Sequence, residues 1–377
     1  MSSSYSFNVI TDIDQAIMLE TTWRTLTEQN IENLQCFMSW EWLVQWLVSY
    51  QDYIDELKII CVMHNDVCIA IAPLYVSTSK TFGMQTSTLA FIATNEPEIC
   101  EVASELIDIA YLPSYKEVIV ELLAKQFYAL NNIHRFHFKD IHKNSLIYSV
   151  CQKIKSSMLS YSEQIVGYQF YINPDDNPNY PASFTKKRKR ILNRFTKFQL
   201  TTNSKFIIAD NKLLALKFYE HLIQLHQQRW HQRNKSGVFE NHCFSNFHRL
   251  FIEKNFEKKM VVISALQIDE KIISVNYSLK WCNVLYFYQS GIDDTYKPNL
   301  SPGLLNHLLL VDYCKVNHIQ QYNLLKSANI DDYKNQFSQL GDELIDVTML
   351  LSTKLNVFRL AINRLKHGLK HLIKRVK

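Results

Sequence analysis

Residues 284–337 contain the groups best suited to bind an anion. The spacing of apolar residues predicts a strand at 285–289, and a polar loop follows that ends in Ser-Pro-Gly at 301–303. Leucines and other apolar residues after this loop predict a helix of about four turns. The first N–H groups of a helix have no partner within it and favour an anion such as a pyrophosphate. Gly303 would let such a ligand approach the backbone closely.

Three short motifs in this stretch resemble those of a known family. They are Gln-Ser-Gly at 289–291, Ser-Pro-Gly-Leu-Leu at 301–305 and Tyr-Lys at 333–334. They are similar to motifs of the GNAT-type acyltransferases of the cellulose-biosynthesis CelD/BcsL family, which is distantly related to the FemAB peptidoglycan aminoacyltransferases. The resemblance covers residues 206–352, and it is weaker at the aromatic segment 37–46.

The resemblance implies a reaction and the residues that perform it. The donor would be an acyl-CoA, with acetyl-CoA favoured, whose pantetheine arm enters between strands at 285–289 and 322–325. The acceptor would be an amine or hydroxyl of a sugar, a glycan precursor or a similar metabolite. Tyr333 could protonate the leaving thiolate, and Lys334 could bind an acid or a phosphate. The implied catalytic residues are Tyr333, Lys334 and Asn323, and the implied donor-binding residues are Gln289, Ser290, Gly291, Ser301, Gly303 and Leu304.

Three residues depart from the family pattern, because Asn323 replaces an acid, Lys326 an arginine and Ser327 a glycine. An inactive pair of GNAT domains that serves as a scaffold is therefore one alternative hypothesis. A FemAB-like transferase that uses aminoacyl-tRNA is a second alternative, although the coiled helical insertion usual in that family is not seen.

The candidate acceptor-binding residues come from two predicted helices and one strand. A basic helix from residue 183 places Arg190 away from its apolar face, whereas Arg188 lies on the apolar side and must extend outward or find a partner. Such a helix could bind phosphate or form a solvated surface. On a helix at 212–233, His226 shares a face with the residues three and four positions later. The candidates are Arg188, Arg190, Arg229, Trp230 and Lys326.

Composition and charge limit the class of protein. The chain has 377 residues, of which 47% are hydrophobic, which is enough for two domains. The net charge of +5 is uneven, because the segments 183–209 and 354–377 are basic and contain no acid. These segments predict anionic partners at two places. Nucleic acid is disfavoured by the absence of interleaved exposed aromatic residues and by the net acidic remainder of the chain. No two glycines have the GxG spacing of a dinucleotide-binding loop.

Several features predict a cytoplasmic protein. The eight cysteines form no CxxC motif, the N-terminus lacks a signal peptide, and no apolar run reaches 18 residues. The segment 354–377 predicts a basic amphipathic helix, which could lie on the inner face of a membrane or dock on protein. No metal is expected, because His134 and His137 would point to opposite faces of a strand.

The remaining pattern predicts a mixed α/β fold of two tandem GNAT-like domains, at 1–160 and 161–353, of which the second is more complete. The predicted elements of the first domain are helices at 14–30 and 40–50, a hairpin at 57–76, a strand at 88–93, helices at 100–110 and 116–131 and a strand at 135–139. Ser39 is expected to cap the second helix, whose stripe with Trp42 and Trp46 is interpreted as core packing rather than a substrate-binding wall.

Overall fold

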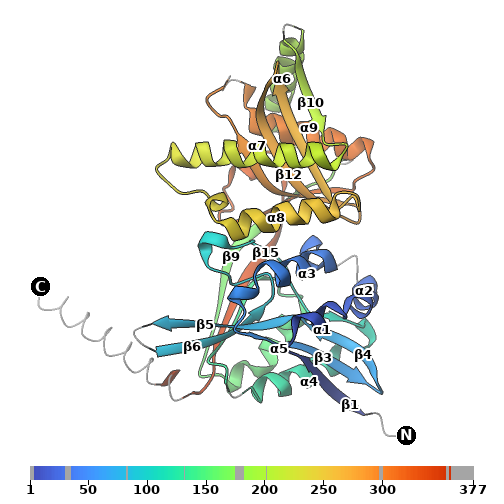
Figure 1. Cartoon of the computed structure of the whole chain (residues 1–377), viewed down its shortest axis with the longest axis vertical. Coiled ribbons are helices and arrows are strands. Elements are labelled where there is room, and N and C mark those ends of the chain that lie inside the picture. The colour runs from blue at the N-terminus through green and yellow to red at the C-terminus, as the bar shows by residue number, and fades with distance from the viewer. Residues whose placement is uncertain are drawn as a thin grey trace, which may run out of the picture.

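The computed structural model describes residues 4–29, 35–81, 84–130, 132–174, 182–200, 202–296, 300–353 and 356–357. They form a mixed α/β protein with an N-terminal unit (residues 4–157) and a C-terminal unit (residues 182–337), which Figure 1 shows one below the other. The helices are α1 (Ile13–Ile17), α2 (Glu20–Glu28), α3 (Trp40–Ser49), α4 (Lys116–Tyr128), α5 (Leu146–Ile154), α6 (Ala182–Gln199), α7 (Lys212–His231), α8 (His242–Asn255) and α9 (Pro302–Val316).

The strands form two sheets. One sheet has the order β1-β3-β4-β7, and the other has the order β10-β11-β12-β13-β14-β9-β15-β8-β6-β5-β2. The strands are β1 (Tyr5–Ile10), β2 (Glu56–Leu57), β3 (Ile59–His64), β4 (Val67–Ala72), β5 (Leu74–Thr81), β6 (Met84–Phe91), β7 (Ala110–Tyr111), β8 (Arg135–Ile141), β9 (Ser160–Ile172), β10 (Ser204–Ile208), β11 (Val261–Ile268), β12 (Lys271–Trp281), β13 (Val284–Ile292), β14 (Gln321–Ser327) and β15 (Gln339–Leu350).

The two units share the larger sheet. The long strands β9 and β15 pair antiparallel along their length and run from one unit to the other (Figure 1). β9 continues the sheet into the C-terminal unit through β14, and β15 continues it into the N-terminal unit through β8. The predicted domain border at residue 160 coincides with the start of β9, and the sheet itself is continuous across it.

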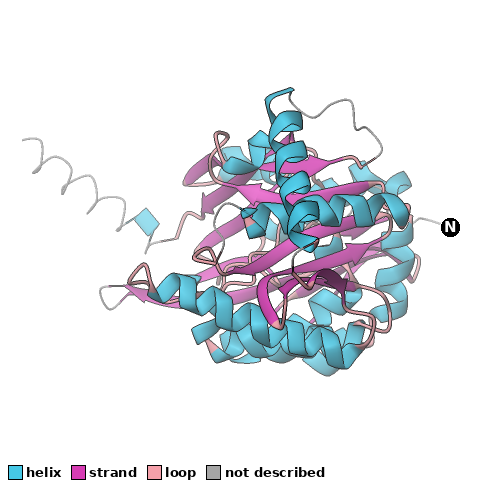
Figure 2. Ribbon diagram, turned by 90° about the horizontal axis from the view of Figure 1, so that it is seen from above, coloured by secondary structure: helices cyan, strands magenta, loops and turns pink. Residues whose placement is uncertain are grey.

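Helices cover both faces of the C-terminal part of this sheet (Figure 2). Successive side chains of a strand point to opposite faces, so β13 contributes to two cores. Tyr286 packs in the core beneath α7 and α8, whereas Leu285 and Phe287 pack in the core beneath α9. β13 therefore lies between two layers of helices. A cleft can form where β13 meets its neighbour β14.

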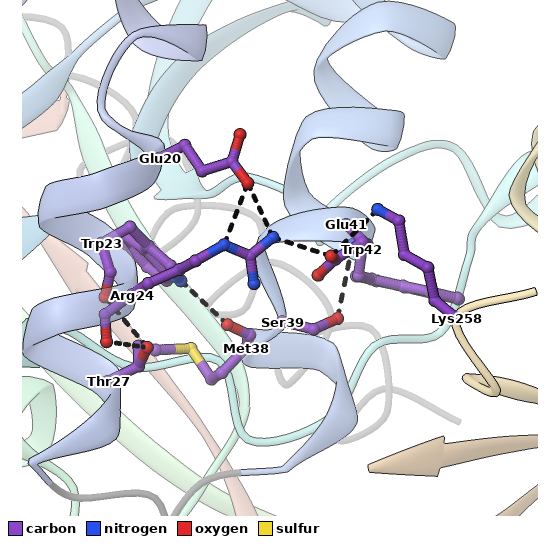
Figure 3. A network of polar contacts seen from close by, with 9 residues as sticks. All are labelled: Glu20, Trp23, Arg24, Thr27, Met38, Ser39, Glu41, Trp42 and Lys258. Atoms are coloured by element: carbon purple, nitrogen blue, oxygen red, sulfur yellow. Dashed lines mark hydrogen bonds and ion pairs between the residues drawn. The ribbon is translucent and has the colours of Figure 1, made fainter. Parts of the chain in front are cut away.

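An aromatic cluster and an ionic network join the two units. The ring of Trp42 in α3 lies 4.9 Å from Phe247 and 5.2 Å from Phe251 of α8, measured between ring centroids. Beside it, Glu41 accepts a hydrogen bond from Arg24 at 2.7 Å and one from Lys258 at 3.2 Å (Figure 3). Burial opposes ionisation of Glu41, but the hydrogen bonds and charges of Arg24 and Lys258, together with a backbone hydrogen bond, outweigh burial and lower the pKa of the carboxyl.

Most of the predicted elements are present. The Ser39 hydroxyl accepts the Trp42 N–H at 3.4 Å and caps α3 as predicted. Trp42 and Trp46 are fully buried, which confirms the interpretation of this stripe as core. The predicted helix at 14–30 divides into α1 and α2, and the second half of the predicted hairpin divides into β4 and β5.

The predicted helix at 100–110 is wrong. A 3₁₀ turn at Glu98–Cys100 is followed by extended chain in which Ala103 and Leu106 have positive φ angles of 47° and 58°. We name residues 98–106 the cleft loop. Its apolar residue Val102 is buried as a helix pattern would require, but tertiary contacts between the units override the helical preference here.

The predicted basic helix at 354–377 lies outside the described residues, apart from residues 356–357, and remains a prediction. None of the described helices is long and apolar enough to cross a membrane.

Candidate active site

Strands β13 and β14 are parallel and part after a short contact, as the sequence predicts. They pair only from Val284 with Gln321 to Tyr286 with Asn323. Beyond this point β13 continues to Ile292 and β14 continues to Ser327 without pairing to each other. The backbones therefore separate near the middle of both strands.

Two β-bulges accompany the separation. On β12, Tyr277 pairs with Gln289 and the next residue, Ser278, pairs with Phe287, so Tyr288 is an extra residue of β13. On β14, Leu325 has a φ angle of 59°, and the register with β9 shifts between Asn323 and Lys326. A positive φ angle is unfavourable for leucine, so the surrounding contacts must hold the β14 bulge.

Two of the implied catalytic residues hold this bulge. The Asn323 side-chain oxygen accepts the Leu325 N–H at 2.8 Å. The Lys334 ammonium group donates to the carbonyl oxygens of Leu324 at 2.8 Å, Lys326 at 2.9 Å and Leu325 at 3.5 Å. Burial lowers the pKa of Lys334, and the carbonyl oxygens supply the polar partners that its charge needs. In this position both side chains shape the backbone of β14.

A cleft of about 1050 Å³ opens where the two strands part, between the N-terminal and C-terminal units. Several parts of the chain line it: the cleft loop, the end of α7 with the connection to α8 and the start of α8, the separated strands, and the turn Tyr333–Gln336. Its lining includes Glu98, Glu101, Glu105, His226, Trp230, Lys235, Phe287, Tyr288, Gln289, Leu324, Lys326 and Lys334. The structure therefore brings four predicted site residues together, namely Trp230, Gln289, Lys326 and Lys334.

Glu105 in the cleft loop was not identified from the sequence. Its side chain is buried, and Oε1 accepts the Lys326 N–H of the β14 bulge at 2.7 Å. Oε2 has no hydrogen-bond partner among the described residues. Burial, with a further contribution from Asp140, raises the pKa of Glu105 to about 7. No local sequence signal marks this residue, because its partners come from strands that are remote in the chain.

The raised pKa of Glu105 predicts a pH-dependent difference in stability between wild type and Glu105→Gln. The folded protein holds a proton that the unfolded chain, with an ordinary pKa near 4.5, releases. The contribution of the Glu105 carboxyl to the unfolding free energy is therefore fully present below pH 4.5, and it is lost as the pH rises through about 7. Relative to wild type, the variant should gain about 2–3 kcal/mol of unfolding free energy between pH 5 and pH 8.

Urea unfolding at the two pH values measures this difference. Glu121→Gln is the control, because Glu121 is exposed and pairs with Lys153 on the surface. The control should show little change between the two pH values. A difference for Glu105→Gln that is independent of pH would show that the folded carboxyl ionises normally.

On the side of α9, aromatic rings fill the space between the strands. The His307 ring lies 4.5 Å from Phe287 and 5.7 Å from Phe337, and its Nδ1 is 2.8 Å from the Tyr322 hydroxyl. Burial lowers the pKa of His307 to about 3, so the ring is neutral at physiological pH. The open part of the gap therefore faces α7, α8 and the cleft loop.

The beginning of α9 lies apart from the residues that line the cleft. Ser301 precedes the helix with a φ angle of 51°, and within the described part of the chain no side chain caps the first turn. Ser301, Gly303 and Leu304 are absent from the cleft lining among the described residues. Ser290 pairs with Asn276 of β12 near the end of β13. Of the candidate donor-binding residues, Gln289 thus lines the cleft, Ser290 and Gly291 pair with β12, and the other three lie at the α9 N-terminus.

Gly291 lies where a helix backbone touches β13. A Cβ atom at this position would lie 2.5 Å from the Leu222 carbonyl oxygen of α7, which cannot move without displacing the helix. Gly291→Ala is therefore expected to lower the unfolding free energy by about 1–3 kcal/mol. Gly303→Ala is the matched control, because its Cβ would meet the end of the Ile292 side chain, which can rotate away. Chemical denaturation of both variants tests this, and equal losses would contradict it.

The other predicted residues lie around the cleft or outside it. Arg188 pairs with Asp312 of α9 at 2.9 Å, which supplies the partner that its position on the helix requires, and Arg190 is exposed. Arg229 pairs with Asp294 at 3.3 Å. Tyr333, in the 3₁₀ turn Tyr333–Gln336, is 51% exposed, and its ring centroid lies 5.9 Å from that of Phe337. The arginines of α6 are therefore separate from the cleft.

Trp230 and His226 form one wall of the cleft. The Trp230 indole N–H donates to His226 Nε2 at 2.8 Å, which fixes both rings on the face of α7 that the sequence predicts. The part of the chain that the structure describes contains no group of three His, Cys, Asp or Glu residues that could hold a metal ion.

Comparisons with known proteins agree with this geometry. Residues 185–335 match the family described as acetyltransferase (GNAT) domain. The matched segment, which includes β13, α9 and β14, is therefore similar to a GNAT acetyltransferase domain. No curated protein matches the chain.

The solved structure of FemX shares the fold at low sequence identity, and two further solved structures are similar to the chain. The structure of FemX is 9% identical, covers 84% of this chain and 92% of its own, and has a TM-score of 0.53. A conserved protein of unknown function from Bacteroides thetaiotaomicron is 12% identical, with coverage of 92% and 100% and a TM-score of 0.48. L-PGS from Bacillus licheniformis is 10% identical, with coverage of 80% and 87% and a TM-score of 0.47.

Proposed function

We propose that the protein transfers an acetyl group from acetyl-CoA to an amine or hydroxyl of a sugar, a glycan precursor or a similar metabolite. The observation that carries this proposal is the parting of β13 and β14 above a cleft, within the segment that matches the acetyltransferase domain. The parted strands offer a slot for an extended donor, and the cleft offers room for an acceptor. The motif resemblance to CelD/BcsL proteins supports the same acceptor class.

The donor would be held by backbone groups. The β13 bulge at Tyr288 interrupts the regular pairing with β12, so that backbone N–H groups near it could polarise the thioester carbonyl. The α9 N-terminus has no described side-chain cap, and its free N–H groups favour the pyrophosphate. Ser290, Ser301, Gly303 and Leu304 would contribute to this part of the site, and Gln289 would contact the acyl group.

The acceptor would enter from the opposite side of the gap. Trp230 supplies a flat apolar surface at the cleft wall, and Lys326 supplies a cation beside the β14 bulge. Tyr333, on which the charge of Arg229 acts, is our candidate to protonate the leaving thiolate. In this assignment Asn323 and Lys334 support the site by holding β14.

Calorimetric titration with acetyl-CoA and with aminoacyl-tRNA tests the proposed donor. We expect binding of acetyl-CoA and none of aminoacyl-tRNA. Gln289→Trp, which would fill the slot, should weaken acetyl-CoA binding by about tenfold or more, equivalent to about 1.4 kcal/mol. Gln320→Trp, on the exposed surface before β14, is the matched control and should bind normally.

The other possible results of these titrations would contradict the proposed donor or its place of entry. Binding of aminoacyl-tRNA alone would favour a FemAB-like reaction, and binding of neither would favour a scaffold. Normal binding by Gln289→Trp would show that the donor does not enter between β13 and β14.

A further inference from the structure

We propose that Glu105 of the N-terminal unit is the proton acceptor for the acyl transfer of the C-terminal unit, and that the acceptor group is an amine. This inference rests on the proposed function and adds a catalytic residue and a substrate class to it. The residue comes from outside the segment that matches the acetyltransferase domain. The N-terminal unit would thereby complete the active site.

The cleft loop is held firmly enough to position a catalytic group. The Tyr288 hydroxyl, from the β13 bulge, donates to the Val102 carbonyl oxygen at 2.6 Å. The Trp42 indole N–H donates to the Ser104 hydroxyl at 2.8 Å. Glu105 follows directly and bonds the Lys326 N–H on β14. These contacts place the Glu105 carboxylate between the two bulges, beside the gap where the thioester would lie.

Glu105 differs from the other carboxylates near the cleft in its partners. Glu101 is paired with Lys139, and Asp140 is paired with the Lys326 ammonium group. Glu105 instead receives a backbone N–H on one oxygen, and its second oxygen has no partner in the described residues. A buried carboxylate with a vacant oxygen can accept a proton from a ligand.

The charged and titratable groups that act on Glu105 come from four elements. They are Asp140 of β8, Lys326 of β14, Lys334 of the turn Tyr333–Gln336, and Cys36 of the 3₁₀ turn Cys36–Met38. Burial, which is the largest effect, and Asp140 favour the protonated form of Glu105, whereas the Lys326 N–H and the two lysine charges favour the ionised form. These opposing effects leave the pKa near 7, which suits proton transfer from an ammonium group far better than from a hydroxyl.

The reaction balances with this assignment. The acceptor enters as R–NH₃⁺, drawn by the carboxylates at the cleft, and Glu105 takes one proton to give R–NH₂. The nitrogen lone pair then attacks the thioester carbonyl carbon, the C–N bond forms, and the C–S bond breaks. The second proton lost from nitrogen ends on the CoA thiolate, and the first passes from Glu105 to solvent. The products are the amide, CoA–SH and one proton.

Release of the CoA thiol as a function of pH tests both parts of the inference. The full-length protein is supplied with acetyl-CoA and with a set of primary amines (glucosamine, spermidine and ethanolamine) or matched alcohols (glucose and ethylene glycol). Slow hydrolysis of acetyl-CoA, with water as acceptor, is followed in parallel. We expect amines to react in preference to alcohols, with a rate that rises with pH through about 7.

Glu105→Gln should reduce kcat about 100-fold and remove the rise with pH, while acetyl-CoA binding is retained. Glu105→Asp should restore part of the rate together with the pH dependence. Glu96→Gln is the control, because Glu96 is also buried with one oxygen lacking a described partner, but it bonds Trp46 and is not among the described residues of the cleft. The control should keep the wild-type pH profile.

Three outcomes would overturn the inference, and one separates it from the proposed function. An unchanged pH profile in Glu105→Gln, for transfer or for hydrolysis, excludes Glu105 as the proton acceptor. Reaction with none of the amines, or preference for alcohols, excludes the amine. Failure of the wild-type protein to bind acetyl-CoA would overturn the proposed function itself.

Discussion

Replacement of Lys334 by methionine is expected to reduce acyl transfer about 100-fold and to lower the unfolding free energy by about 3 kcal/mol. The Lys334 ammonium group bonds three successive carbonyl oxygens, from Leu324 to Lys326, in the bulge that separates β14 from β13. Methionine has a similar length but cannot donate, so these carbonyl groups would lose their charged partner. Leu325, with its positive φ angle, would then relax toward a regular strand and narrow the gap.

Steady-state release of the CoA thiol and urea unfolding measure the two effects. Lys217→Met is the control, because Lys217 is exposed on α7 and should change neither quantity. A loss of stability without a loss of activity would show that the β14 bulge does not shape the site. Activity at the wild-type level in both variants would remove Lys334 from the mechanism.

Replacement of Trp42 by alanine is expected to cost about 3–5 kcal/mol of unfolding free energy. The side chain is fully buried and packs against rings from both units, including Phe37, Phe247 and Tyr288. The cavity left by alanine would lie between α3 and α8, where the units meet. Loss of stability should therefore be accompanied by loss of the contact between them.

A second variant separates the ring of Trp42 from its hydrogen bond. Trp42→Phe keeps an aromatic side chain but removes the N–H that bonds Ser104 in the cleft loop. We expect a stability loss of only about 1 kcal/mol, because one hydrogen bond is removed, together with a larger effect on kcat than on donor binding. Urea unfolding and acetyl-CoA titration test this. An equal stability loss in both variants would show that the hydrogen bond to Ser104, and not the packing of the ring, provides the stabilisation.

Residues close together in the chain were sufficient to predict the core of the candidate site. The apolar pattern of β13, the Ser-Pro-Gly sequence before α9 and the short strand β14 are local signals, and the structure contains all three elements in the predicted order. The separation of β13 and β14 after a short parallel contact was implied by the family resemblance and not by these local signals. Helix caps such as Ser39 depend on residues within one turn, which explains why they could be identified without a fold.

The roles of individual side chains depended on contacts between distant parts of the chain. Lys334 matches the family pattern, whereas Asn323 stands where the family has an acid. The hydrogen bonds of both residues to the β14 bulge could not be predicted, because a bulge depends on which strands become neighbours. The cleft loop has the apolar spacing of a helix but is extended, since α3 and β13 bind it on two sides.

Glu105 and the Lys326 N–H that it bonds are 221 residues apart in sequence. The pattern of residues therefore indicated where an acyl donor would enter. Folding of the two units onto one sheet was needed to bring a carboxylate beside it, because burial and charge at that point arise from strands that no local pattern connects.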